Sequence, residues 1–410
     1  MKAIIRHIAK AILSFLSVLF WANGAHAQVD HTNYEIDARM HFGYLYFQSD
    51  QYHSALGRYN AHVPSYEFSL RRNTYGQHRW EVLNNYPSIG LTFYYSHFGN
   101  KEVMKELGQV FALYPFINFP IIPNEQHKLA LKVGVGLSYL TNKFHPTENY
   151  HNFAIGSHVN AAINLSFEYR QYITERVHWI TSAGLTHFSN GSTMTPNMGI
   201  NIFSVATGFS WYLNKPKSLI DKRLLPKLYP FELDGKKHFV TDIQYTFGYK
   251  DMTQQYGTHG FYYIHDLASN FMFQLNERDR VGFGIELVKD NSGKALHEDW
   301  DKEYYFTKVG FLFAYEMCLD RLSFMFNFGR RIDDFHFLDK NADNPTQLIF
   351  RFYEKLATRY YFYDNMYAVL AFTTYDIKAD FISIGIGYHF NHKYYLPSYE
   401  KKHRSPIFPR

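Results

Sequence analysis

The sequence predicts an all-β fold in which antiparallel strands close into membrane-spanning barrels, and three observations lead to this prediction. Apolar and polar residues alternate with a period of two in one segment after another, as in strands with one face toward lipid and one toward a packed interior. Aromatic residues make up 19% of the 410-residue chain, with 35 Tyr and 38 Phe, and aromatic girdles are typical of such barrels. Beyond residue 27, no apolar run approaches the ~20 residues that a transmembrane helix needs. A soluble β-sandwich would also alternate, but it would rarely be so rich in aromatic residues.

Residues 1–27 have the pattern of a secretory signal peptide. A basic start is followed by the short apolar segment 11–21 and by the small-x-small cleavage site Ala25-His26-Ala27. We therefore expect the mature chain to begin at Gln28 and to leave the cytoplasm.

Charge and composition argue against several other classes of protein. The net charge of +5 is small for this length and gives no reason to expect a nucleic-acid partner. The single cysteine, Cys318, cannot form an intramolecular disulfide. Histidines such as His151 and His158 lack the spacing of metal ligands, so neither a metal site nor a cofactor is expected.

About eight strands fit between residues 35 and 213, which is the smallest closed number for a membrane barrel. In the segment 129–140, for example, branched apolar residues occupy one face and small or polar residues the other. The apolar face must meet lipid, so the polar face lines the interior. The charged residues Lys132, Glu168 and Arg170 then point inward, where they can form ion pairs.

The alternation stops after the first half and later returns. We predict a barrel over 28–214, a basic, proline-bearing linker over 215–238, a second barrel half over 239–390 and a tail over 391–410. About eight strands again fit in the second half, so the halves resemble a diverged duplication. Two tandem eight-stranded barrels are favoured by their similar lengths, by the linker and by the small inward residues. The alternative is one barrel of about fourteen to sixteen strands.

An unusual polar group lies at the end of the seventh predicted strand. Alternation places His187, Ser189 and Asn201 on the same side as the lipid-facing residues of the two strands that flank the connection 190–200. Because both termini of an even-stranded barrel are periplasmic, the seventh strand runs outward. The three side chains are therefore expected at the outer-leaflet end of the barrel.

The segment His187-Phe188-Ser189-Asn190, the loop that follows it and the continuation Pro196-Asn197-Met198-Gly199-Ile200 resemble the lipid A 3-O-deacylase family over about residues 30–214. Members of this family are outer-membrane barrels that cut an ester-linked acyl chain from lipopolysaccharide. The resemblance implies that His187 is the catalytic base and Ser189 the nucleophile. It also implies lipid A as substrate and the Gram-negative outer membrane as location. The family's third catalytic residue, a Glu, falls on Asn201 here.

Ester hydrolysis also needs a group to orient the base and donors for the oxyanion. Asn201 can accept a hydrogen bond from the His187 ring, as an amide does in Cys-His-Asn proteases. Asn190, Asn197 and the backbone N–H of Gly191 are the candidate oxyanion donors.

The leading hypothesis is a serine esterase that removes an ester-linked 3-hydroxyacyl chain from lipid A. The second half carries 371–374 (Ala-Phe-Thr-Thr) where the first half carries His187 and Ser189, so no equivalent site is expected there. The alternative is a non-catalytic barrel that binds lipopolysaccharide or has a structural or transport role. The oligomeric state is left open.

Overall fold

The structure is a computed structural model that describes twelve segments of the chain: 33–46, 62–76, 78–98, 106–123, 127–213, 239–251, 260–276, 278–292, 307–332, 350–363, 365–375 and 378–390. The predicted signal peptide, the linker 215–238 and the tail 391–410 lie outside these residues.

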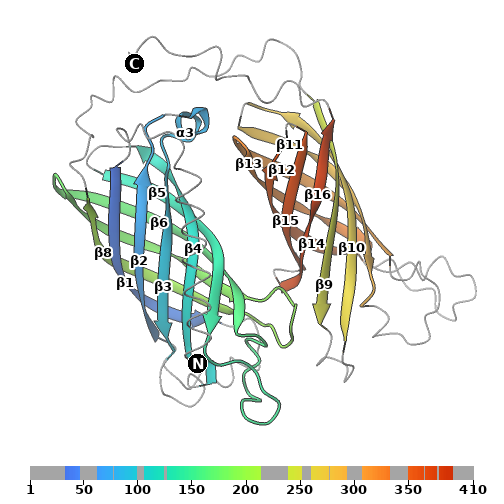
Figure 1. Cartoon of the computed structure of the whole chain (residues 1–410), viewed down its shortest axis with the longest axis horizontal. Coiled ribbons are helices and arrows are strands. Elements are labelled where there is room, and N and C mark those ends of the chain that lie inside the picture. Colours follow the sequence, from blue (N-terminus) through green and yellow to red (C-terminus); the bar gives the residue numbers. More distant parts are fainter. Residues whose placement is uncertain are drawn as a thin grey trace, which may run out of the picture.

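The first eight strands form a closed barrel in which each strand pairs with its neighbour in sequence and β8 pairs with β1 (Figure 1). The strands are β1 (Asn33–Tyr46), β2 (His62–Asn73), β3 (Ser88–His97), β4 (Gln109–Pro123), β5 (His127–Leu140), β6 (Val159–Thr174), β7 (Val177–Ser189) and β8 (Ile200–Tyr212). A short helix, α3 (Arg79–Leu83), follows β2. Among the described residues, no helix has the length and apolar character required to cross a membrane.

The next eight strands form a second closed barrel in which β16 pairs with β9. They are β9 (Phe239–Asp251), β10 (Phe261–Gln274), β11 (Asp279–Asp290), β12 (Thr307–Leu319), β13 (Leu322–Ile332), β14 (Phe350–Tyr361), β15 (Met366–Tyr375) and β16 (Lys378–Phe390). Two eight-stranded barrels are thus confirmed. The alternative of one larger barrel is wrong, because β8 finds its second partner in β1 rather than in β9.

The predicted directions of the side chains are confirmed in both barrels. On β5, Val135 and Leu137 are 48% and 65% exposed, whereas Lys132 is fully buried. On β16, Ile384 and Ile386 face outward, and Ser383, which alternates with them, is buried on the interior side. An apolar exterior and a polar interior are what a barrel immersed in lipid requires.

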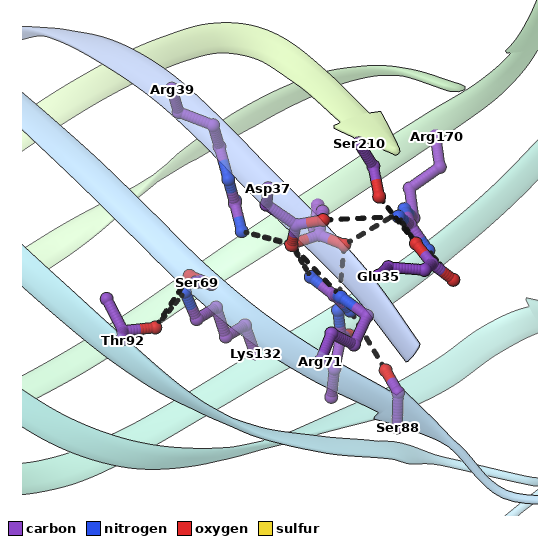
Figure 2. Close-up of polar contacts among 12 residues, drawn as sticks. Glu35, Asp37, Arg39, Ser69, Arg71, Ser88, Thr92, Lys132, Arg170 and Ser210 are labelled. Carbon is purple, nitrogen blue, oxygen red and sulfur yellow. Dashed lines mark hydrogen bonds and ion pairs between the residues drawn. The ribbon is translucent and has the colours of Figure 1, made fainter. Parts of the chain in front are cut away.

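Charged side chains fill the interior of the first barrel toward the end where β1 begins (Figure 2). Arg71 donates to Asp37 over 2.8 Å and to Glu168 over 2.9 Å. Further ion pairs in this interior include Lys132–Glu67, Arg170–Glu35, Arg39–Glu67 and Arg39–Glu168. The pairing predicted for Lys132, Glu168 and Arg170 is confirmed, and it satisfies charges that would otherwise be costly to bury.

Apolar side chains fill the opposite end of the first barrel. Tyr94, Tyr114, Leu140, Phe188 and Ile202 belong to one buried cluster there. The interior is thus packed along its length, as expected of a small barrel, and its apolar end lies under the predicted site.

The second barrel has the same kind of charged interior. Arg359 pairs with Asp242 over 3.0 Å, and Lys355 pairs with Glu286 over 2.7 Å. Met272, Leu312 and Tyr353 belong to a buried apolar cluster of the same barrel, so its interior is packed as well.

Candidate active site

The last residues of β7 set the direction of the candidate catalytic side chains. Phe188 is fully buried inside the barrel, with its ring centroid 6.0 Å from that of Tyr94. Because side chains alternate along a strand, His187 and Ser189 point to the outer face. His187 lies directly opposite Asn201 of β8 in the strand register. The predicted grouping of these side chains on one face is what the structure shows.

His187 and Asn201 form a direct hydrogen bond. The ring Nδ1 and the amide Oδ1 are 2.7 Å apart. A carbonyl oxygen only accepts, so Nδ1 carries the proton and donates it to Asn201. In the neutral ring, the unprotonated nitrogen is then Nε2. This is the tautomer that a general base needs.

Gly199 leaves room for the His187 ring. A Cβ added at Gly199 would lie 2.8 Å from Cε1 of His187, and the backbone there has a φ of +76°. Both features favour glycine at this position. The position of the His187 ring and the backbone conformation thus explain why the Pro-Asn-x-Gly-Ile segment has a glycine at position 199.

Ser189 is 1% exposed, and its hydroxyl has no hydrogen-bond partner among the described residues. The hydroxyl is therefore not hydrogen-bonded to His187 in this structure. In substrate-free enzymes, such catalytic bonds are often long and shorten in the substrate complex. An unpartnered hydroxyl at a buried position is rare, so the hydrogen-bonding capacity of Ser189 Oγ is unused in this structure.

The loop 190–199 is held by hydrogen bonds within the loop and to the connection between β5 and β6. The Asn190 side chain donates to Ser157 Oγ over 2.9 Å and to the Met194 carbonyl over 2.7 Å. The backbone N–H of Asn190 donates to Asn197 Oδ1 over 2.9 Å. Both hydrogen bonds of the Asn190 amide nitrogen are thus used to stabilise the loop, which leaves this side chain less suited to donate to an oxyanion.

The other two predicted oxyanion donors remain near the end of β7. The Nδ2 group of Asn197 is buried and has no hydrogen-bond partner among the described residues. Gly191 follows with a φ of +62°, a conformation that turns the chain immediately after Ser189 and Asn190. Asn197 is therefore the side-chain donor left available.

The connection between β5 and β6 supports this loop, a role that the sequence did not indicate. The backbone N–H groups of Met198 and Gly199 donate to the carbonyls of Phe153 and Ala154 over 3.3 and 3.0 Å. A Cβ at Gly156 would come within 2.7 Å of the Met194 carbonyl. The Gly156-Ser157 pair in the sequence is the only signal that could have indicated this close packing.

No group of three or more His, Cys, Asp or Glu side chains in the described segments is arranged to hold a metal ion. His158, which lacks ligand spacing in the sequence, donates from Nδ1 to the Leu140 carbonyl over 2.8 Å. Cys318 is a free cysteine on β12.

The protein has two closed eight-stranded antiparallel barrels with apolar exteriors and paired internal charges, and a polar group lies at one rim. These features place it in the class of outer-membrane β-barrels. Within this class, residues 65–210 match the family model described as Lipid A 3-O-deacylase (PagL). Residues 239–392 match the model described as Acyloxyacyl hydrolase, C-terminal domain. The first match runs from within β2 to β8 of the first barrel, and the second spans the second barrel. The resemblance of the first barrel to the lipid A 3-O-deacylase family is therefore confirmed.

Similarity to solved structures is weaker. The structure titled as that of the outer membrane enzyme PagL is 14% identical, with a TM-score of 0.30, over 42% of this chain and 97% of that one. OccAB3 of Acinetobacter baumannii is 9% identical, with a TM-score of 0.22, over 88% of this chain and 99% of that one. A mutant porin of Rh. blastica is 9% identical, with a TM-score of 0.17, over 87% of this chain and 100% of that one. No curated protein sequence gives a significant match.

Proposed function

We propose that this protein is an outer-membrane serine esterase that removes an ester-linked 3-hydroxyacyl chain from lipid A. Ser189 is the nucleophile, His187 the general base and acid, and Asn201 the group that orients His187. The observation that carries the proposal is the His187–Asn201 hydrogen bond of 2.7 Å beside the buried, unpartnered hydroxyl of Ser189. It lies within the segment that matches the lipid A 3-O-deacylase model.

The reaction follows from these groups in two steps. Ser189 Oγ attacks the ester carbonyl carbon and gives its proton to Nε2 of His187. The tetrahedral intermediate then breaks its bond to the sugar oxygen, which leaves with the proton from His187. Water, activated by the same nitrogen, releases the 3-hydroxy fatty acid and restores Ser189. In each step His187 takes up one proton and gives it back. Ester hydrolysis changes no oxidation state, so no redox partner is needed.

Asn201 contributes orientation and only part of the electrostatic stabilisation. Its amide oxygen holds Nδ1–H in place, but it lacks the full charge with which a carboxylate stabilises an imidazolium. Asn197 Nδ2 and the Gly191 backbone N–H are the proposed oxyanion donors, because such donors act on charge that develops at the carbonyl oxygen.

The position of the site suits a substrate in the outer leaflet. The connections 141–158 and 190–199 leave the first barrel at the end where β5 and β7 finish, whereas only residues 175 and 176 join β6 to β7 at the opposite end. Longer loops are extracellular and short turns periplasmic in outer-membrane barrels. Lipopolysaccharide occupies the leaflet that His187 and Ser189 would then face.

The test is mass spectrometry of lipid A from Gram-negative cells that express the wild type, Ser189→Ala or His187→Ala. We expect a lipid A species lacking one 3-hydroxyacyl chain only with the wild type. The wild type and the two variants must be folded to the same extent. Identical lipid A in all three strains would contradict the proposal and favour the rival, a non-catalytic barrel that binds lipopolysaccharide. The amide at position 201 is the observation that favours this rival.

A further inference from the structure

The candidate catalytic loop is hydrogen-bonded to the second barrel. Thr195 donates from its backbone N–H and from Oγ1 to Oδ2 of Asp251, over 3.0 and 3.1 Å. The backbone N–H of Asp251 donates to the Ser192 carbonyl over 2.9 Å. In turn, Ser192 Oγ donates to the carbonyl of Ala379 over 2.8 Å. Asp251 ends β9 and Ala379 lies near the start of β16, so two strands of the second barrel contact one loop of the first (Figure 1).

Apolar packing adds to these hydrogen bonds. A Cβ added at Gly191 would lie 2.3 Å from Cγ1 of Ile382 and 3.4 Å from a ring carbon of Phe372. Only a residue without a side chain permits this approach of the two barrels. On the same outer face, Ile384 is 63% exposed, while Ile382 and Phe372 are half-buried. We call Asp251, Phe372, Ala379 and Ile382 the docking rim.

A buried ion-pair network fixes the docking rim within its own barrel. Lys250 Nζ contacts Asp290 over 2.7 Å and Asp380 over 2.9 Å. Lys308 contacts the same oxygen of Asp290 over 2.9 Å. Lys250 precedes Asp251, and Asp380 follows Ala379, so the Lys250–Asp380 pair joins the two backbone segments that hold the loop.

The contacts also agree with the direction of both barrels. Odd-numbered strands of the first barrel run toward the end where the loop 190–199 lies, and β9 and β15 of the second barrel run toward the docking rim. The two barrels therefore present the same end to each other, as two domains inserted side by side in one membrane must do.

We propose that the docking rim of the second barrel is a positioning surface for the catalytic loop, with Asp251 as its central positioning residue. This inference rests on the proposed esterase function. The loop carries Asn197 and connects Ser189 to the strand of Asn201, so its conformation sets the geometry of nucleophile, oxyanion donor and base. Displacements of about 1 Å in such an arrangement reduce rates by about 100-fold. The second barrel, which lacks the His-x-Ser motif, thus completes the site of the first.

The test uses the full-length protein with Asp251→Ala and Asp251→Asn. Asparagine retains an oxygen that accepts from Thr195, whereas alanine does not. We expect Asp251→Ala to lower kcat on lipid A by about 10- to 100-fold with a smaller change in KM, and Asp251→Asn to restore most of the rate. Asp279→Ala is the matched control, because Asp279 bonds to Arg278 and Tyr315 within the second barrel and lies at its opposite end.

A second measurement does not depend on catalysis. Backbone hydrogen exchange of peptides that cover 190–199 should become faster in Asp251→Ala and stay unchanged in Asp279→Ala. In addition, Thr195→Val should add little to Asp251→Ala, because Asp251→Ala already removes the acceptor of the Thr195 hydroxyl.

Unchanged kcat and unchanged exchange in Asp251→Ala would overturn the inference while leaving the esterase function intact. Equal losses in Asp251→Ala and Asp279→Ala would also overturn it, because the effect would then be general destabilisation of the second barrel. If the wild type itself does not hydrolyse lipid A, the proposed function fails, and the exchange measurement still decides whether the rim holds the loop.

Discussion

Asn201 provides the sharpest test of how His187 is held. Its Oδ1 is 2.7 Å from Nδ1 of His187, and the two residues are directly opposite in adjacent strands. When His187 takes the proton of Ser189, this bond becomes a hydrogen bond to a charged group, which contributes about 1.5–3 kcal/mol. Loss of that contribution in Asn201→Ala should lower kcat/KM by about 10- to 150-fold, at about 1.4 kcal/mol per tenfold.

The assay is the rate of lipid A hydrolysis by purified, detergent-solubilised protein, with two further variants. Asn201→Glu should keep or raise the rate, because a carboxylate stabilises the imidazolium better than an amide. Thr207→Val is the matched control on the same strand, since Thr207 accepts from Trp179 Nε1 over 2.8 Å far from His187. Full activity of Asn201→Ala would refute the reasoning and show that another group orients the histidine.

Two further predictions concern the barrel interior and the loop. Glu168→Ala removes the shared acceptor of Arg39 and Arg71 and should lower the free energy of unfolding by about 3–5 kcal/mol, as measured by urea titration with gel mobility as readout. An unchanged urea midpoint would mean that the buried arginines find other partners. Gly199→Ala should push the His187 ring, because the new Cβ would lie 2.8 Å from Cε1, and should reduce activity by about tenfold or more while the barrel stays folded. Wild-type activity in this variant would show that the ring does not need its present position.

The strand directions could be predicted from the sequence because a period of two is a local property. The alternation around Lys132 and Glu168 is sufficient to place both inside, whatever the barrel's size. The outward direction of His187 and Ser189 follows from the same rule. The pairing of His187 with Asn201 could also be anticipated, since both residues lie near one connection and share a face.

Contacts between distant segments could not be predicted in this way. Nothing near Asp251 in the sequence indicates that it binds Thr195, because that contact depends on how two separately closed barrels pack. The choice between one barrel and two also depends on which strand pairs with β8, a non-local property of closure. The engagement of Asn190 with Ser157 likewise required the position of the β5–β6 connection.

The most direct test of the central claim is the release of 3-hydroxy fatty acid from purified lipid A by the purified protein. Ser189→Ala is compared with Ser182→Ala, a serine on the same strand whose side chain is buried toward the barrel interior. We predict fatty acid release by the wild type and by Ser182→Ala, and none above background by Ser189→Ala. Release by Ser189→Ala at the wild-type rate, or no release by the folded wild type, would contradict the assignment of Ser189 as the nucleophile of a lipid A esterase.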